Sequence, residues 1–436
     1  MFDPDQSRGT SKGALVLASN LFYRRELFGA TVYNCEDKSV RFFNLSAAYC
    51  LEAFMLPKSV AAAGAMLSSV YEDAQSVCAF IETLEQQRML EQSTTPHPAS
   101  QRFFMERLDF DPDRLVAPLG LEFELTLRCR RKCTYCAYSS HPQYPATGEM
   151  TLNSYAEAFS KARDAGVFYV RFTGGDPLFR SDALEIIEEA DTRGFAIAVA
   201  SDLTALNAGQ IARLAGLKNL TVIQTTLDGP NALIADRHRG NGSFATVIEG
   251  ITQLRSANIP VMVGTVLTTD NASQIYAIAQ VLAPFRVSYC VSPLYSAGRG
   301  RSVEHLIPND DDLADAYEQF AHAVDSGLVA PADPGWSAIA KVYERSKRSA
   351  LWRSQPWLLR SPDRILRIDP WGNCYAGIQA KEALHDNVYV GNITQRSLLE
   401  IWASSPTLNL LRAQAEPNTY FGAVVDIRSL RRTANA

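Results

Sequence analysis

Between residues 121 and 294 the chain alternates apolar, strand-like segments with amphipathic segments, and this pattern restricts the fold more than any other feature. Apolar residues return at helical spacing in 155–165, 183–192, 244–256 and 272–282. Such alternation predicts βαβ units and a parallel sheet. The six strand-like segments are residues 121–127, 167–173, 195–201, 221–227, 260–267 and 287–294.

Six units are too few for a closed eight-fold barrel. We therefore expect an α/β fold built on a partial (β/α)6 barrel of TIM-like type, with its chemistry at the C-terminal ends of the strands. Two smaller domains are predicted beside it, so that the chain divides into residues 1–100, 115–310 and 311–436. The boundary after the first domain is the Ser-, Thr- and Pro-rich segment 91–100.

The flanking segments have different patterns from the barrel. Short strands at 30–33 and 40–45 precede three stretches of helical spacing, the last at 74–90, which predicts a small winged-helix-like domain. Toward the C-terminus, a hairpin is predicted at 365–375 and a short helix at 398–403. These elements indicate a small α+β extension.

Composition excludes several classes of protein. The 436 residues include 42 basic and 47 acidic side chains, so the net charge of -5 argues against a partner that is nucleic acid. Apolar runs stay far below the length of a membrane span, and the acidic N-terminus does not resemble a signal peptide. We expect a cytoplasmic protein. Eight cysteines are too few for a disulfide scaffold in a chain of this length.

Three of the cysteines lie together, directly after the first barrel strand. Cys129, Cys133 and Cys136 have CxxxCxxC spacing, and the basic residues around them are expected to favour thiolates. Structural zinc needs a fourth ligand, and the nearest histidine, His141, is followed at once by Pro142. An iron-sulfur cluster ordinarily has four cysteine ligands, so three would leave one iron open.

A CxxxCxxC loop after the first strand of a parallel barrel resembles that of the radical S-adenosylmethionine (radical SAM) family. The resemblance implies one 4Fe-4S cluster bound by Cys129, Cys133 and Cys136, whose open iron binds SAM and cleaves it reductively to a 5′-deoxyadenosyl radical. It also places Tyr135 at the SAM site and implies an external electron donor such as flavodoxin or ferredoxin.

Further motifs follow at the ends of later strands. Gly174, Gly175, Asp176 and Pro177 resemble the family's GGEP segment, whose backbone meets the SAM amino group, with Asp in place of Glu. Glycines permit close approach of backbone, and a carboxylate suits an ammonium. Read without the resemblance, Gly-Gly-Asp-Pro is a turn.

The remaining strand ends carry the other candidate ligands of SAM and substrate. Ser201 and Asp202 stand where relatives have Thr-Asn and are assigned to ribose or substrate, the alternative being a helix-initiating pair. Thr226 and Asp228 belong to a segment similar to SLDGP, and Asp228 is a candidate catalytic residue together with Asp202.

Two later positions complete the assignment. In a shortened HxxxRG stretch, Arg239 is assigned to the SAM carboxylate, with an ordinary surface arginine as the alternative. Leu294 lies in the segment from Pro293 to Arg299, which resembles the family's PxxxxGR segment, where an apolar side chain packs on adenine.

The first ninety residues resemble the PqqD-like domain (RRE) that recognises the leader of a ribosomally made precursor peptide. An exposed strand edge between Val40 and Leu45 is expected to accept the leader as an added strand, with residues 74–90 as the apolar wall. A winged helix that binds DNA is the alternative, but residues 1–100 hold 8 basic and 11 acidic side chains. A purely structural cap is a further alternative.

The C-terminal segment resembles the SPASM or twitch extension of radical SAM maturases. Its first cluster ligand is expected at Gly377, while Cys374 lies three residues earlier, so we predict a degenerate extension without an auxiliary cluster. Cys374 is a candidate catalytic hydrogen-atom donor, with Cys290 as a competing donor and a plain buried thiol as the alternative.

Together these features predict a peptide maturase that cross-links or epimerises a precursor peptide at an unactivated C–H bond. Two alternatives stay open: a radical SAM enzyme for a small molecule, and a catalytically silent peptide-binding scaffold with a structural cluster.

Overall fold

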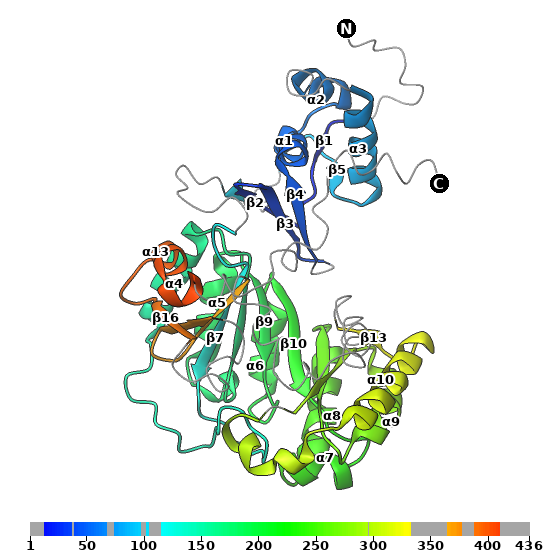
Figure 1. Cartoon of the computed structure of the whole chain (residues 1–436), viewed down its shortest axis with the longest axis vertical. Coiled ribbons are helices and arrows are strands. Elements are labelled where there is room, and N and C mark those ends of the chain that lie inside the picture. The colour runs from blue at the N-terminus through cyan, green and yellow to red at the C-terminus, as the bar shows by residue number, and fades with distance from the viewer. Residues whose placement is uncertain are drawn as a thin grey trace. The chain divides into compact units, whose positions relative to one another are not determined.

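The computed structural model describes residues 13–36, 39–67, 74–96, 102–103, 115–294, 296–332, 364–376 and 388–409 (Figure 1). These residues form two compact units, one that ends at Val116 and one that begins at Ala117. The described residues on both sides of residue 310 belong to the same compact unit. This division does not separate a C-terminal domain from the barrel, and the predicted boundary there stays a prediction. Among the described residues, every helix is too short or too polar to cross a membrane.

The N-terminal unit consists of a small sheet and three helices. Strands β2, β3 and β4 form an antiparallel meander, β6 lies parallel to β2, and β1 pairs with β5. The strand β4 is therefore an edge strand among the described residues. The elements are β1 Leu15–Leu17, β2 Leu21–Glu26, β3 Gly29–Asn34, β4 Val40–Asn44, α1 Leu45–Ala53, α2 Val60–Leu67, α3 Ala74–Gln86, β5 Leu90–Gln92 and β6 Arg102–Phe103.

Strand β2 was not predicted from the sequence, because buried charged side chains interrupt its apolar pattern. Arg24 and Glu26 form an ion pair of 2.6 Å with both side chains fully buried. The Glu26 carboxylate also accepts hydrogen bonds from the Thr31 hydroxyl at 2.9 Å and from the Val116 amide at 2.9 Å. A buried charge is tolerated when it is paired and hydrogen-bonded in this way.

Helix α3 supplies the apolar face that the sequence predicts. Its residues Val77, Phe80, Ile81 and Leu84 follow helical spacing and belong to the same buried cluster as Phe43 of β4. The sheet and α3 therefore share one core.

The second unit is built on ten of the described strands, in the order β13-β12-β11-β10-β9-β8-β7-β14-β15-β16. The strands β7 to β12 are parallel to their neighbours. They agree with the six predicted segments to within two residues at either end. Closure into a partial barrel stays a prediction. The strands are β7 Gly120–Thr126, β8 Tyr169–Gly174, β9 Ala196–Ala200, β10 Leu220–Thr226, β11 Val261–Leu267, β12 Ser288–Pro293, β13 Ala330–Pro331, β14 Ile365–Ile368, β15 Asn373–Ala376 and β16 Tyr389–Asn392.

The C-terminal hairpin continues this sheet. Strand β14 pairs in parallel with β7, and β15 and β16 follow in antiparallel order. The predicted hairpin is confirmed, whereas Gly377 lies outside the described residues.

Helices connect the strands. The four predicted helical segments appear as α4, α5, α8 and the η3-α9 pair, whereas α6, α7 and α10 were not predicted. The bounds are α4 Leu152–Asp164, η2 Pro177–Phe179, α5 Ala183–Thr192, α6 Ala208–Ala215, α7 Ala232–Arg239, α8 Ser243–Ser256, η3 Ala272–Gln274, α9 Ile275–Leu282, η4 Ala283–Phe285, η5 Gly298–Leu306, α10 Asp310–Asp325 and α13 Leu398–Ser404.

The two faces of the sheet differ in polarity. Phe123 of β7 packs edge-on against Phe159 of α4, with ring centroids 5.3 Å apart. On the opposite face, Arg171 of β8 donates hydrogen bonds of 2.6 Å to Glu122 of β7 and 2.6 Å to Gln224 of β10. Because side chains alternate along a strand, each position can be assigned to the apolar or the polar face by register.

Candidate functional site

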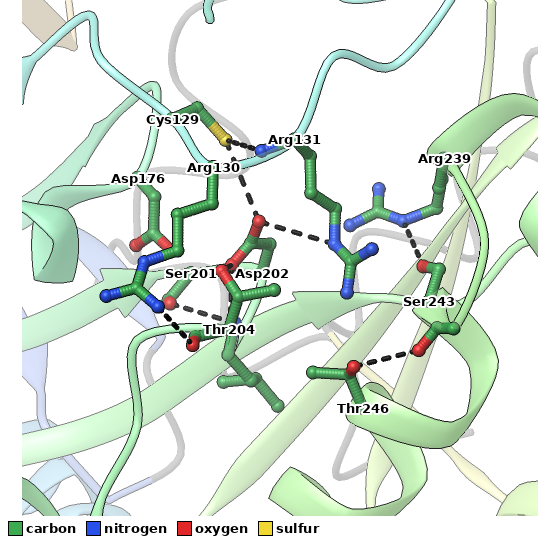
Figure 2. Close-up of polar contacts among 12 residues, drawn as sticks. Cys129, Arg130, Arg131, Asp176, Ser201, Asp202, Thr204, Arg239, Ser243 and Thr246 are labelled. Atoms are coloured by element: carbon green, nitrogen blue, oxygen red, sulfur yellow. Dashed lines mark hydrogen bonds and ion pairs between the residues drawn. The ribbon is translucent and has the colours of Figure 1, made fainter. Parts of the chain in front are cut away.

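The predicted cysteine loop begins three residues after β7. The Cys129 side chain is buried, and Cys133 and Cys136 are partly buried. The Cys129 thiol donates a hydrogen bond of 3.7 Å to Oδ2 of Asp202 and accepts one of 3.4 Å from the Arg131 amide. Figure 2 shows these contacts, which join the loop to the end of β9.

The donor set of the loop fits an iron-sulfur cluster better than a single ion. Among the described residues, no three His, Cys, Asp or Glu side chains are placed to hold one metal ion. An iron-sulfur cluster takes each thiolate on a different iron, so its ligands need not converge on one point, and cysteine is its usual ligand. Cys129, Cys133 and Cys136 are the residues that would bind it.

The expectation that neighbouring basic residues favour thiolates is wrong for Cys129 and Cys133. Burial raises the pKa of both thiols, and Asp202 and Asp176 raise the pKa of Cys129 further. Arg131 does not compensate, because its Nε lies 3.3 Å from Asp202 Oδ2 in an ion pair. Arg131 and Arg128 pair with neighbouring carboxylates instead, and binding to a metal would be what favours the thiolates.

The Gly-Gly-Asp-Pro segment packs directly against the start of the cysteine loop. A Cβ on Gly174 would lie 2.2 Å from the Thr126 carbonyl oxygen, and one on Gly175 would lie 2.2 Å from the Arg128 carbonyl oxygen. The Asp176 amide donates a hydrogen bond of 2.9 Å to that same Arg128 oxygen. The glycines are thus required by contact with protein backbone, whatever ligand the segment also meets.

Asp176 has the geometry expected for a cation ligand. Its Oδ1 caps η2 by accepting from the Leu178 amide at 3.1 Å, and Pro177 is the first residue of that turn. Its Oδ2 is buried and has no hydrogen-bond partner of good geometry among the described residues, although Ser201 and Asp202 lie close by. An ammonium donor would satisfy this atom.

Asp176 and Asp202 behave as a pair of facing carboxyl groups. Burial, followed by the nearby Asp202, raises the pKa of Asp176 well above its usual value. Burial also acts to raise the pKa of Asp202, but the neighbouring Asp176 side chain and the hydrogen bonds from Thr204 outweigh it, so that the pKa of Asp202 is lowered. A cation bound beside Asp176 would favour its charged form and so lower its pKa.

Ser201 and Asp202 form a turn, and the alternative of a helix start is wrong. The Ser201 hydroxyl accepts from the Leu203 amide at 3.0 Å, and Asp202 Oδ1 accepts from the Thr204 amide at 2.8 Å. The next helix, α6, begins only after Asn207, which caps it. The Asp202 side chain therefore reaches Cys129 from a turn and not from a helix.

Asp228 is held by protein donors on both carboxylate oxygens. Its Oδ1 accepts from the Val266 amide at 2.8 Å, and its Oδ2 accepts from the Tyr135 hydroxyl. Arg239 lies 3.9 Å from the same Oδ2 and is itself buried, so the alternative of an ordinary surface arginine is wrong. Asp228 thus has the contacts of a structural link, and its predicted catalytic role stays a prediction.

Thr226 and Leu294 lie at the C-terminal ends of β10 and β12, which are separated by β11 in the sheet. Thr226 is the last residue of β10 and pairs with Gly264 of β11. Leu294 follows β12 and packs with Tyr135 and Leu306. The structure therefore brings Leu294 to the cysteine loop, while its predicted contact with adenine stays a prediction.

Sequence reasoning missed how residues 298 and 299 hold the cysteine loop. Arg299 donates hydrogen bonds of 2.7 Å to the Cys133 carbonyl oxygen and 2.9 Å to the Ser140 carbonyl oxygen. Gly298 has a φ of +52°, and a Cβ there would lie 2.2 Å from the Ala137 carbonyl oxygen. The sequence identifies Gly298 and Arg299 as part of a motif, but it does not predict that they contact the cysteine loop.

The two candidate hydrogen donors lie on different faces of the sheet. Cys374 of β15 pairs with Ile368, which pairs with Phe123, so its side chain belongs to the apolar face. Cys290 of β12 pairs with Gly264, on the face of Gln224. Both thiols are buried, which raises the pKa of each to about 12.

This placement does not favour the predicted role of Cys374. Six strands separate its strand from that of Cys290, so the two thiols do not form a shared site in the sheet. The Cys374 thiol instead donates to the Gly372 carbonyl oxygen at 3.7 Å.

Comparison with known proteins agrees with this site. Residues 123–282 match the model of the radical SAM superfamily. The mycofactocin maturase MftC of Mycobacterium ulcerans is 26% identical over 301 residues, which is 68% of this chain and 78% of MftC. An AdoMet-dependent heme synthase of Methanosarcina barkeri is 30% identical over 212 residues, or 47% of this chain and 57% of the synthase.

Solved structures show the same fold over almost the whole chain. Streptococcus suis SuiB, solved bound to its precursor peptide SuiA, has a TM-score of 0.68 at 13% identity and covers 96% of this chain and 97% of its own. SuiB has also been solved bound to S-adenosylmethionine. At this level of identity the likeness concerns the fold. The match to the family model, with all three grouped cysteines inside it, identifies residues 123–282 as a radical SAM domain.

Proposed function

We propose that this chain is a radical SAM enzyme that modifies a ribosomally synthesised precursor peptide. The observation that carries the proposal is the fold shared with SuiB, which spans 96% of the chain and so extends beyond the radical SAM domain into the N-terminal unit. SuiB was solved with a precursor peptide. The resemblance to a mycofactocin maturase supports the same class of activity.

The cofactors of this function are one 4Fe-4S cluster and SAM. When bound, they supply a carbon-centred radical able to abstract hydrogen from an unactivated C–H bond. Cys129, Cys133 and Cys136 would hold the cluster. Asp176 would accept from the SAM ammonium, because its Oδ2 lacks a well-placed donor, and the buried Arg239 guanidinium would pair with the carboxylate.

The N-terminal unit is proposed as a leader-recognition domain of winged-helix type. A Cβ on Gly29 of β3 would lie 2.0 Å from the Phe43 carbonyl oxygen, and the Ser39 carbonyl accepts from Asn34 of β3 at 2.9 Å. Residues 39 and 43 therefore direct their backbone groups toward β3. Because this direction alternates along a strand, the groups of Val40 and Phe42 point to the open edge and can accept an added strand.

A wall for such a strand lies next to β4. The Arg41 guanidinium donates a hydrogen bond of 2.7 Å to Gln87, directly after α3, and Phe43 shares a core with Phe80 and Leu84 of that helix. The predicted wall at 74–90 is consistent with these contacts. The DNA-binding alternative receives no support from them.

The remaining expectations complete the proposal. The C-terminal strands and α13 would form the degenerate SPASM- or twitch-like cap, and a flavodoxin or ferredoxin would supply the electron. A cytoplasmic location suits a cluster that depends on reduction.

A small-molecule substrate is the second candidate function. It is favoured by the 30% identity to an AdoMet-dependent heme synthase, which exceeds the identity to MftC. That match covers only 47% of this chain, however, and so leaves about half of the chain unexplained.

The test is an anaerobic reaction of the reconstituted full chain with SAM, a reductant and a synthetic peptide encoded by a short reading frame beside the gene. Peptide modification detected by mass spectrometry, together with 5′-deoxyadenosine, is the expected result. Formation of 5′-deoxyadenosine without any change in the peptide would favour a small-molecule substrate. Absence of both products with a fully loaded cluster would favour the silent scaffold.

A further inference from the structure

His238 lies between the cysteine loop and a second loop that follows β11. Its Nδ1 atom is 3.0 Å from the Thr134 hydroxyl oxygen, and its Nε2 atom is 2.9 Å from Asp270 Oδ2. The His238 carbonyl oxygen also accepts from the Thr134 amide at 2.9 Å. Thr134 is therefore bound twice by one residue of α7, and we name these contacts the His238 bridge.

The carboxylate fixes the hydrogen-bond directions in this bridge. An ionised Asp270 only accepts, so the imidazole donates from Nε2, and its Nδ1 then accepts from the Thr134 hydroxyl. Asp270 is held in turn by Arg237, whose guanidinium donates to the same Oδ2 at 2.9 Å. The His238 side chain is 13% exposed and Asp270 is 26% exposed, so their contact is partly shielded from water, whereas Thr134 is exposed.

The bridge is adjacent to two residues of the candidate site. Tyr135 follows Thr134 and donates to Asp228, while Arg239 follows His238 and lies 3.9 Å from that same carboxylate. The rings of Tyr135 and His238 are 6.0 Å apart. The short helix α7 is thus linked to the middle of the cysteine loop by two consecutive residues. His238 contacts Thr134 directly, and Arg239 is linked to Tyr135 through Asp228.

A second set of contacts, made by Arg299, holds the same loop at its cysteines. Arg299 binds the carbonyl oxygens of Cys133 and Ser140, as described above. The Arg299 amide also donates to the Cys136 carbonyl oxygen at 3.0 Å, so Arg299 holds the backbone at both ends of the Cys133–Cys136 segment. The His238 bridge holds Thr134, which lies between these two contacts.

We infer that His238, held by Asp270, is a positioning residue that fixes the Cys133–Cys136 segment in the geometry its cluster requires. This role rests on the proposed function, because it presumes that the cysteines bind a cluster. Without the bridge the segment between the two ligands would gain freedom, and a cluster bound there would be lost more readily.

The test compares reconstituted full-length variants by two measurements. The first is the rate at which an iron chelator removes iron, and the second is the electron paramagnetic resonance spectrum of the reduced cluster. His238→Leu removes both side-chain contacts and is expected to release iron about tenfold faster, in line with the loss of two hydrogen bonds. Its spectrum is expected to broaden, because the cluster then samples several geometries.

Further variants separate positioning from folding. His238→Gln can still donate to Asp270 or accept from Thr134 and is expected to recover part of the loss. Asp270→Ala and Thr134→Val each remove one side of the bridge and are expected to release iron about threefold faster. The matched control is His322→Leu, since His322 stacks on Tyr276 at 4.8 Å in another part of the unit.

The outcomes distinguish this inference from the proposed function. Wild-type rates and spectra in His238→Leu, Asp270→Ala and Thr134→Val would overturn the positioning role and leave the enzyme proposal intact. An unaltered chain that assembles no cluster would overturn both. Should His238→Leu fail to fold, the two single-contact variants decide the question alone.

Discussion

The hydroxyl group of Tyr135 donates a hydrogen bond to Oδ2 of Asp228, which joins the cysteine loop to the residue two positions after β10. Both side chains are buried. Burial raises the pKa of Tyr135 well above its usual value, and Asp228 raises it further, so the hydroxyl remains the donor. The loop that carries the candidate metal ligands is therefore anchored in the core of the radical SAM domain.

Replacing Tyr135 by Phe is expected to destabilise the protein by about 1–3 kcal/mol, because a buried carboxylate oxygen loses its donor. Chemical denaturation measures this free energy of unfolding. Tyr155→Phe is the matched control: the Tyr155 hydroxyl is buried without a hydrogen-bond partner among the described residues, so its removal is expected to change stability little. Equal effects of the two variants would contradict the anchoring role.

Changing Cys129, Cys133 or Cys136 singly to Ala is expected to abolish SAM cleavage. The unaltered chain should hold about four iron atoms after reconstitution, and each variant should hold clearly less. Iron and sulfide analysis and the yield of 5′-deoxyadenosine provide the measurements. Cys78→Ala, which alters a partly buried thiol of the N-terminal unit, serves as control. About eight iron atoms per chain would contradict the prediction of a single cluster.

Gly298→Ala is expected to lower the iron content of the reconstituted protein. Its Cβ would collide with the Ala137 carbonyl oxygen at 2.2 Å, so the cysteine loop would have to move. Gly242→Ala isolates the cost of the backbone conformation, since Gly242 has a φ of +78° and open space around its Cβ position. The prediction fails if the two variants lose iron to the same extent.

Val40→Pro is expected to weaken binding of the leader peptide while SAM cleavage without peptide persists. Val40 begins β4, its amide points to the open edge, and proline at the first residue of a strand leaves the existing ladder in place. Fluorescence anisotropy of a labelled leader peptide measures the affinity. We expect the affinity to decrease by about fivefold, because one hydrogen bond is lost. Val40→Ala retains the amide and is expected to bind nearly as well; unchanged affinity in Val40→Pro would exclude this edge as the docking site.

Some modifications return a hydrogen atom to the peptide. For these, the positions of Cys290 and Cys374 in the sheet predict that Cys290 is the hydrogen donor. Cys290 lies on the polar face near Gln224, and its raised pKa keeps the S–H bond intact at neutral pH. Cys290→Ala should therefore abolish deuterium incorporation from deuterated water without stopping SAM cleavage. Cys374→Ala should leave both unchanged, and loss of incorporation in that variant would restore the role predicted from sequence.

Several properties of this protein follow from the sequence alone. The six parallel strands were predictable because buried parallel strands give continuous apolar runs, and helices between them repeat every 3.6 residues. The candidate cluster ligands could be proposed because Cys129, Cys133 and Cys136 lie close together along a single loop. Features of this kind depend on residues close in sequence.

Only the tertiary structure decided which distant groups meet. His238 contacts Thr134 across 104 residues, and Arg299 contacts Cys133 across 166. Many histidines and arginines offer the same donors, so nothing local selects these partners. The face to which Cys290 or Cys374 belongs depends on strand register, which a shift of one residue would reverse. Burial likewise raises the thiol pKa values that the neighbouring basic residues were expected to lower, because desolvation is a property of the folded chain.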